Sequence, residues 1–148
     1  MNCTFFGHKD CPSNIKQILK NEIIKCYLQN NVRCFYVGND GNFDLLVQSI
    51  LFELSTSLGD LDFTIVLSRP DENIDQSLFS HTYFPPCLDN VPPRFRISKR
   101  NEWLINNSYF IITYTARYIS NTYKWVRRGY KKGLKITNAA PVNINYDF

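Results

Sequence analysis

Apolar residues follow two patterns that alternate along this chain. Continuous apolar runs rich in aromatic and β-branched residues predict buried strands. These runs lie at 2–6, 32–37, 61–67, 109–114 and 134–137. Apolar residues that recur at the spacing of one helix face predict helices. These stretches lie at 13–29, 43–58, 98–108 and 121–132. Strand and helix therefore alternate along the chain.

This alternation predicts an α/β fold. Strands that are apolar throughout, rather than at every second residue, are typical of a parallel sheet covered by helices on both faces. With right-handed crossovers the result is a Rossmann-like, doubly wound three-layer sandwich with a mostly parallel five-stranded sheet. Ligands of such folds bind at the carboxyl ends of the strands, near the point where the strand order reverses.

One segment breaks the pattern. Residues 68–97 contain five prolines and form a connection far longer than the usual length of about 4 to 6 residues. We interpret the segment as disordered or as a lid-like insertion, and its aromatic residues favour packing back onto the body. The prediction is a single domain over residues 1–138 that includes this insertion, followed by a C-terminal tail at 139–148.

Length and composition favour a globular protein. At 148 residues, with 44% hydrophobic and 15% aromatic residues, the chain can bury a core and is too apolar for disorder. It has no apolar run long enough for a membrane span and no secretory pattern at its start, so we expect a cytoplasmic protein without a membrane partner. The five cysteines form no C-x-x-C pair. Reduced thiols, no metal site and no required cofactor are therefore expected.

The net charge of +4 is unevenly distributed. Between Arg94 and Lys135 the chain has eleven basic residues and a single acidic one, Glu102. A surface of this kind attracts anionic partners. The alternative is a solvated basic face that the acidic first half balances.

The loop after the second predicted strand has the composition of a ligand site. In FYVGNDGNFD (35–44), Gly38, Asn39 and Gly41 let the backbone come close to a ligand, and the helix that follows offers its amides to an anion or a ribose. Asp44 lies in the first helical turn, where a carboxylate would repel phosphate. We therefore interpret Asp44 as an acceptor for ribose hydroxyls or as a capping residue. The alternative is a loop that glycine merely keeps tight.

A second candidate loop follows the first predicted strand. In GHK, Gly7 allows a tight turn at the strand end, and His8 and Lys9 offer hydrogen-bond donors to a phosphate or a ribose. A histidine at such a position also has a common structural role.

Four motifs, taken together, resemble the YpsA-like branch of the SLOG superfamily. They are CTFFGHKDCP (3–12), FYVGNDGNFD (35–44), VPPRFRISKRNEWLINNSYFIITY (91–114) and SNTYKWVRRGYKKGLKITN (120–138). This superfamily contains Rossmann-like domains such as those of the bacterial DNA-processing protein DprA and the LOG phosphoribohydrolases. The resemblance covers residues 3–138. It implies that the protein binds a nucleotide or a nucleotide-derived, ADP-ribose-like ligand, as a sensor or regulatory module.

The resemblance also implies roles for particular residues. Arg100 matches an arginine that faces the substrate in LOG enzymes, and Arg94 would reach the same ligand from the end of the insertion. The residues Ser120, Asn121 and Thr122 stand where LOG enzymes have a phosphate-binding loop. For each arginine, a surface ion pair is the alternative role.

The same motif bears on catalysis. LOG enzymes have a Gly-Gly-x-Gly-Thr loop followed by a glutamate, whereas residues 119–125 of this chain are ISNTYKW and keep only the threonine. Without that carboxylate we assign no catalytic residue and favour binding without turnover. A nucleotide N-glycosidase or phosphoribohydrolase, with Glu102 or Asp44 in place of the lost group, is the alternative.

Two further expectations concern partners. Aromatic residues among the basic ones between 114 and 130 resemble a surface for single-stranded nucleic acid, although part of this set falls at helical spacing. Nucleic-acid binding is therefore the third hypothesis. The family resemblance also suggests a homodimer that makes contact through aromatic helix faces.

Overall fold

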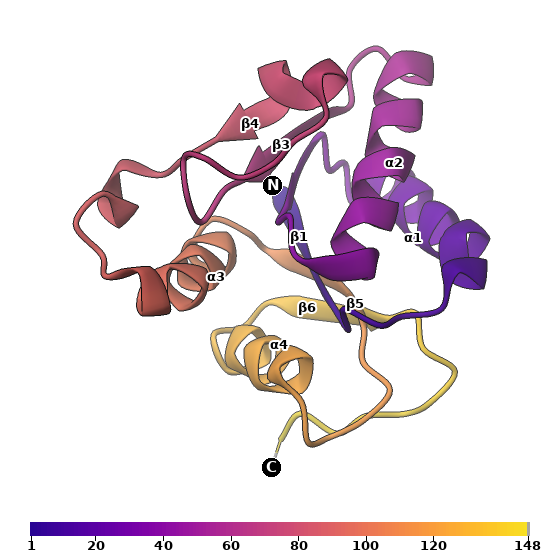
Figure 1. The fold of residues 1–148 in the computed structure, drawn as a ribbon. Helices are drawn as coiled ribbons and strands as arrows, with labels where there is room; N and C mark the ends of the chain where they lie inside the picture. Colours follow the sequence, from indigo (N-terminus) through magenta and orange to yellow (C-terminus); the bar gives the residue numbers. More distant parts are fainter. Residues whose placement is uncertain (148) are drawn as a thin grey trace.

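One parallel sheet forms the centre of the protein, whose structure is a computed structural model that describes residues 1–147 (Figure 1). In this range the sheet contains the strands β1 (Asn2–Gly7), β2 (Cys34–Val37), β3 (Asp62–Val66), β4 (Thr82–Tyr83), β5 (Phe110–Tyr114) and β6 (Lys135–Asn138). Their order is β4-β3-β2-β1-β5-β6, and neighbouring strands are parallel throughout. The chain therefore builds outward from β1 in one direction, then crosses back and builds outward in the other.

Helices cover both faces of this sheet (Figure 1). The helices α1 (Lys16–Gln29) and α2 (Gly41–Ser57) pack on one face, and α3 (Arg96–Asn106) and α4 (Asn121–Lys131) pack on the other. Short 3-10 turns lie at Ser13–Ile15, Gln76–His81, Pro86–Leu88 and Pro93–Phe95. The predicted Rossmann-like, doubly wound α/β sandwich is confirmed.

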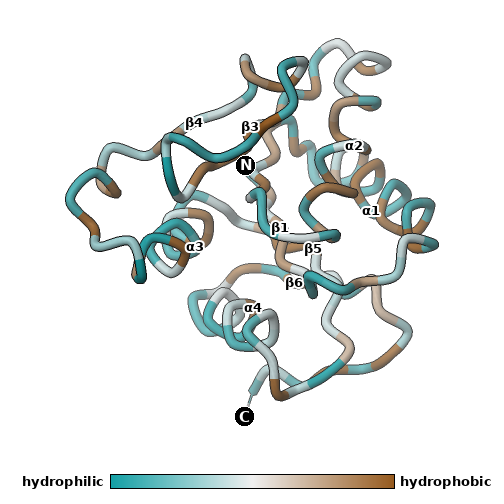
Figure 2. Tube along the Cα trace, in the orientation of Figure 1, coloured by the Kyte–Doolittle hydropathy of each residue, from teal (hydrophilic) through white to brown (hydrophobic). Residues whose placement is uncertain are grey.

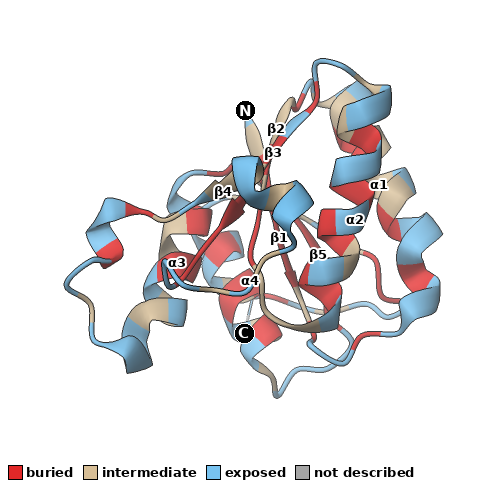
Figure 3. Cartoon of the chain, turned by 45° about the horizontal axis from the view of Figure 1, so that its top comes forward, coloured by how far each residue is buried: buried red, intermediate tan, exposed pale blue. Residues whose placement is uncertain are grey.

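The central strand is buried on both faces, as is typical of strands in a parallel sheet. In β1 the four residues Cys3 to Phe6 are all buried, because helices lie above and below them (Figure 3). The larger core cluster lies on the α1 and α2 side, where Leu19, Phe35 and Phe43 are fully buried. On the other face α4 is mostly hydrophilic along its length, and only a stripe of it enters the core (Figure 2).

The predicted number of strands was wrong, because the sheet has a sixth strand, β4. It pairs with β3 through Ile65 opposite Thr82 and Val66 opposite Tyr83. A strand of two residues leaves no periodic signal, and the prolines around it favour a loop interpretation. The extra strand lies at the edge of the sheet, where few hydrogen bonds are needed to hold it.

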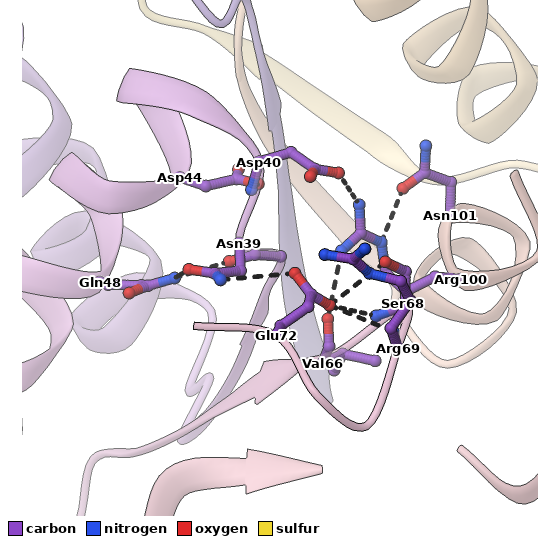
Figure 4. A network of polar contacts seen from close by, with 11 residues as sticks. Asn39, Asp40, Asp44, Gln48, Val66, Ser68, Arg69, Glu72, Arg100 and Asn101 are labelled. Atoms are coloured by element: carbon purple, nitrogen blue, oxygen red, sulfur yellow. Dashed lines mark hydrogen bonds and ion pairs between the residues drawn. The ribbon is translucent and has the colours of Figure 1, made fainter. Parts of the chain in front are cut away.

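The remainder of segment 68–97 is held by buried and capped groups. The Glu72 carboxylate accepts hydrogen bonds from the backbone amides of Ser68 at 2.6 Å and Arg69 at 3.3 Å (Figure 4). Further along, Leu88 is completely buried. Ile97 is the one residue of the segment that lines the main cleft of the molecule as described over residues 1–147.

The C-terminal tail packs on α4. The ring of Tyr146 is buried and stacks on Tyr123 with 5.7 Å between ring centres. Two hydrogen bonds fix the neighbouring backbone, since Tyr123 donates to the carbonyl of Asn145 and the amide of Asn145 donates to Tyr118. Among the described residues, no helix has the length and apolar character needed to cross a membrane.

Candidate functional site

A cleft of about 530 Å³ opens at the carboxyl edge of the sheet, where β1 and β5 are neighbours. This is the point at which the strand order reverses, so the loops after β1 and β5 separate and leave space between them. The loop after β2 and the first turns of α2, α3 and α4 complete the lining. The cleft therefore lies where the sequence predicted a ligand site.

One side of the cleft, which we call the inner wall, consists of Asp40, Asp44, Arg100 and Asn101. Arg100 is only 3% exposed, and each of its nitrogens has a protein partner (Figure 4). Its Nη2 donates to Asp40 Oδ2 at 2.7 Å, its Nη1 to the carbonyl of Val66 at 3.2 Å, and its Nε to Asn101 Oδ1 at 3.0 Å. This arginine thus ties α3 to the ends of β2 and β3.

Asp44 lies beside this arginine and is itself buried. Its Oδ2 accepts a hydrogen bond from the backbone amide of Asp40 at 2.8 Å. Burial disfavours the charged carboxylate and raises the pKa of Asp44 to about 6, although the Arg100 guanidinium and the Asp40 amide act in the opposite direction. The inner wall therefore contains a carboxyl group that can hold or release a proton near neutral pH.

Gly38 makes this close arrangement possible. A Cβ at this position would lie 2.7 Å from Arg100 Nη1 and 2.9 Å from Asp44 Oδ2, which is closer than real Cβ contacts come. The glycine is thus required by the buried arginine and carboxylate. The backbone at Gly38 thus comes close to the protein's own side chains, whereas the sequence had predicted a close approach to a ligand.

A second group of lining residues, which we call the outer wall, comes from the loop after β1 and from the loop and helix after β5: Lys9, Asp10, Arg117, Ser120, Asn121, Thr122 and Lys124. Ser120 is the N-cap of α4, and its Oγ accepts a hydrogen bond from the amide of Tyr123 at 3.1 Å. The first amides of α4 and three basic side chains therefore lie along one cleft. Helix N-termini of this kind favour anions.

His8 lies between the two walls and is buried. Its Nε2 accepts a hydrogen bond from the amide of Ala116 in the loop after β5, at 3.0 Å. Burial and the Arg117 guanidinium lower the pKa of His8, while the Asp10 carboxylate raises it. The histidine thus connects the loops that follow β1 and β5.

Nine of the predicted site residues lie together in this cleft. They are Gly7, His8, Lys9, Gly38, Asp44, Arg100, Ser120, Asn121 and Thr122. Arg100 does not have the open position that the LOG resemblance implied, because its nitrogens are already engaged within the protein.

The other three predicted residues lie outside the cleft lining. Asn39 donates to Glu72 Oε1 and to the carbonyl of Asn73, so it ties the loop after β2 to the start of segment 68–97 (Figure 4). Gly41 has a positive φ of 85° and packs against Lys9, where a Cβ would come within 2.6 Å of Lys9 Cβ. Arg94 lies on an exposed turn with its guanidinium 4.7 Å from the centre of the Phe95 ring.

Sequence reasoning missed several cleft residues. Asp40 stood within the glycine loop without being chosen, and Asn101 and Trp125 follow residues that were considered. The two carboxylates of that loop, four residues apart, were the signal that could have found Asp40. Trp125 belongs to the aromatic set between 114 and 130, which was assigned to the nucleic-acid hypothesis rather than to this cleft.

Two further groups bear on the chemistry. Glu102 lies outside this cleft and pairs with Lys99 at 3.4 Å and Arg128 at 3.5 Å, so the carboxyl groups that line the cleft are those of Asp10, Asp40 and Asp44. Within residues 1–147, no three His, Cys, Asp or Glu side chains gather in the manner of a metal site.

The strand order and the position of the cleft define a Rossmann-like domain. A search of solved structures found DNA processing protein A (DprA) from Streptococcus pneumoniae, with a TM-score of 0.64 and 13% sequence identity. The match covers 91% of this chain and 48% of that one, so the chain spans about half the length of DprA. No protein-family model and no curated protein match the sequence. At this identity the likeness shows the fold alone.

Proposed function

We propose that the protein binds a nucleotide or a nucleotide-derived, ADP-ribose-like ligand in the cleft at the carboxyl edge of the sheet. The observation that carries this proposal is that one cleft combines the basic side chains and helix amides of the outer wall with the carboxyl groups of Asp40 and Asp44 on the inner wall. A nucleotide is complementary to both groups, because its phosphate accepts hydrogen bonds from basic side chains and amides and its ribose hydroxyls donate to carboxylates. The YpsA-like resemblance of the sequence supports the same ligand class.

The charges of the walls favour one orientation of this ligand. Phosphate lies at the outer wall, near the capped N-terminus of α4, because that side offers donors and positive charge. The ribose hydroxyls lie at the inner wall and donate to Asp40 and Asp44, which accept when ionised. Arg100 holds the Asp40 carboxylate in place, and the backbone amide of Asp40 in turn holds Asp44.

We propose that binding occurs without turnover, in a sensor or regulatory role. The chain lacks the glutamate and glycines of the LOG loop in residues 119–125. One observation nevertheless favours a second candidate, hydrolysis of a nucleotide N-glycosidic bond. Asp44 lies in the cleft with a pKa raised to about 6, which suits a general acid or base at neutral pH.

A thermal-shift experiment tests these proposals. Purified protein is heated with AMP, NAD, ADP-ribose or cyclic ADP-ribose, and each compound that stabilises it is then incubated and assayed for free base. Stabilisation without base release supports a binding module, because a ligand that binds only the folded state raises the melting temperature. Base release that Asp44→Asn abolishes supports the hydrolase instead. If no nucleotide shifts the melting temperature, the proposed function is wrong.

Short single-stranded DNA belongs in the same experiment, because the similar structure is that of a DNA processing protein. Several aromatic residues expected to stack on bases already contact other rings of the protein: Tyr123 meets Tyr118 edge-on at 5.2 Å between ring centres, and Tyr130 contacts Tyr146 of the tail at 6.0 Å. Stabilisation by DNA alone, with a steep dependence on salt, would favour the nucleic-acid hypothesis over ours.

A homodimer is also part of the proposal. Exposed apolar side chains on α2 and the neighbouring turn, Leu45, Phe52 and Phe79, offer a contact surface of the kind that oligomers bury. Sedimentation of the purified protein over a range of concentrations gives its mass in solution. A monomer at every concentration contradicts this part alone.

A further inference from the structure

The hydrogen bonding of His8, which lines the cleft, defines which of its two ring nitrogens carries the proton. The side chain is 4% exposed, and Nε2 accepts the Ala116 amide proton. A ring nitrogen that accepts a hydrogen bond carries no proton, so the proton of the neutral imidazole is on Nδ1. Among residues 1–147, Nδ1 has no hydrogen-bond partner. An N–H donor without a protein partner is therefore present on a side chain that lines the cleft, and it is not among the fully buried unpaired atoms of the described residues.

The bond to Ala116 also supports the outer wall. Ala116 precedes Arg117, whose carbonyl accepts a hydrogen bond from Ser120 Oγ at 3.2 Å. On the other side, Thr115 is held by Asn138, which accepts from its amide at 3.0 Å and donates to its carbonyl at 2.9 Å. The loop from β5 to α4 is thus fixed at its start by Asn138, next by His8, and at its end by the cap of α4.

Charged and titratable groups surround His8 on several elements. Its own loop contributes Lys9 and Asp10, and the loop after β5 contributes Arg117. Tyr114 at the end of β5 meets the imidazole edge-on, with 6.1 Å between ring centres. The remaining groups that line the same cleft are Asp40, Asp44, Arg100 and Lys124. Arg117 and burial favour the neutral ring, and Asp10 opposes them.

We propose that neutral His8 is a specificity residue of this cleft, whose Nδ1–H donates to a phosphate oxygen of the ligand while Nε2 holds the loop after β5. This inference rests on the proposed nucleotide binding and names the group that recognises the phosphate. Phosphate oxygens only accept hydrogen bonds, so they match a donor that has no proton-accepting partner nearby. Lys9 and Arg117, on either side, supply the charge.

The same geometry predicts an unusual dependence on pH. Protonation of His8 adds a positive charge, which by itself would strengthen the binding of an anion. The added proton is on Nε2, however, where it meets the Ala116 N–H, and two donors cannot bond to each other. The loop after β5 then loses one of its supports. Binding therefore weakens as pH falls, opposite to the effect of charge alone.

Two variants separate the two ring nitrogens. In His8→Gln the side-chain oxygen can accept from Ala116, as Nε2 does, but the donor at the position of Nδ1 is lost. In His8→Asn the amide nitrogen replaces the Nδ1 donor, but the side chain is too short to reach Ala116. We expect His8→Gln to keep the melting temperature and to bind ADP-ribose about tenfold more weakly. His8→Asn should melt at a lower temperature and retain more of the affinity.

Calorimetric titration of the full chain with ADP-ribose measures both effects. The two phosphates of this probe keep their charge between about pH 5.5 and about pH 8, so changes in affinity report on the protein. Affinity of the unaltered protein should fall several-fold at the lower pH. Asp44 also titrates in this range, but it does so equally in His8→Gln, so the difference between the two proteins isolates His8.

Three results would overturn the inference. The first is that His8→Gln binds as the unaltered protein does, and the second is that the affinities of both variants simply follow their melting temperatures. The third is that the affinity difference between the unaltered protein and His8→Gln does not change with pH. If the unaltered protein binds neither ADP-ribose, AMP nor NAD, the proposed function itself fails and this inference fails with it.

Discussion

On the inner wall of the cleft the side chain of Arg100 is 3% exposed and meets only protein groups, whereas on the outer wall Arg117 and its partner Asp10 are 53% and 71% exposed. Each arginine pairs with an aspartate: Arg100 with Asp40 at 2.7 Å, and Arg117 with Asp10 at 3.1 Å. Burial makes the first pair part of the folded framework, because breaking it leaves charges without water. Exposure leaves the second pair free to exchange its partner for a ligand. Of the two arginines, only Arg117 is therefore available to meet a ligand.

Removal of the buried cation should have the largest effect. Arg100→Met leaves Asp40 without its ion-pair partner and Asp44 without the nearby positive charge, so we expect the free energy of unfolding to fall by about 3 to 5 kcal/mol. Arg128→Met, on an ion pair that is about half exposed, is the control, with an expected loss of at most about 1 kcal/mol. Urea unfolding at neutral pH measures both. Equal losses would mean that burial does not distinguish the two arginines.

Asp44 should make the stability depend on pH. Its pKa is 3.8 in the unfolded chain and about 6 when folded, so the folded state binds the proton more tightly. The free energy of unfolding should therefore fall by about 3 kcal/mol in total as the pH rises from about 3 to about 7, with most of the fall between the two pKa values.

Asp44→Asn should remove that fall, and the exposed carboxyl in Asp89→Asn should leave it unchanged. The measurement is urea unfolding at several pH values for the three proteins. An identical pH profile for Asp44→Asn and the unaltered protein would show that Asp44 titrates normally.

Gly38→Ala tests how tightly the inner wall is packed. The new Cβ would lie within 3 Å of atoms of Arg100 and Asp44, so the wall must shift, at a cost of about 1 to 3 kcal/mol. Gly59→Ala is the matched control, because a Cβ there meets nothing within 4 Å. Thermal unfolding of the two variants gives the comparison. A Gly38 variant as stable as the Gly59 variant would mean that the wall yields easily.

The outer wall should respond in the opposite way. Arg117→Gln removes only an exposed ion pair, so stability should change by less than about 1 kcal/mol, while affinity for ADP-ribose should fall by about tenfold. Arg128→Gln, an arginine outside the cleft, should leave affinity unchanged. Calorimetric titration checks the affinities. A stability loss in Arg117→Gln as large as that of Arg100→Met would remove the distinction between the walls.

The sequence allowed prediction of the fold and of most of the cleft, but not of the relations among its residues. Continuous apolar runs identified the main strands, and the positions of Gly38 and His8 just after strands placed them at the carboxyl edge. The partners of Arg100, however, lie 34 and 60 residues away in Val66 and Asp40. Such contacts depend on how α3 packs beside β2 and β3, which no local pattern encodes.

The same limit applies to His8, whose partner Ala116 is 108 residues away. Its position at the end of β1 indicated a site, yet the acceptor role of Nε2 became apparent only once the two loops were side by side. The strand β4 was missed for a different reason, since two residues between prolines carry too little information.

That short strand also bears on aggregation through the edge of the sheet. Without β4 the edge of β3, with its buried Phe63 and Ile65, would offer open backbone groups to any passing strand. Thr82 and Tyr83 pair with one end of this edge, and the His81 ring stacks on Phe63 at 4.1 Å and approaches its carbonyl at 3.3 Å. The proline-rich segment thus covers the edge of β3, and the short strand β4 leaves few free backbone groups with which a strand of another chain could pair.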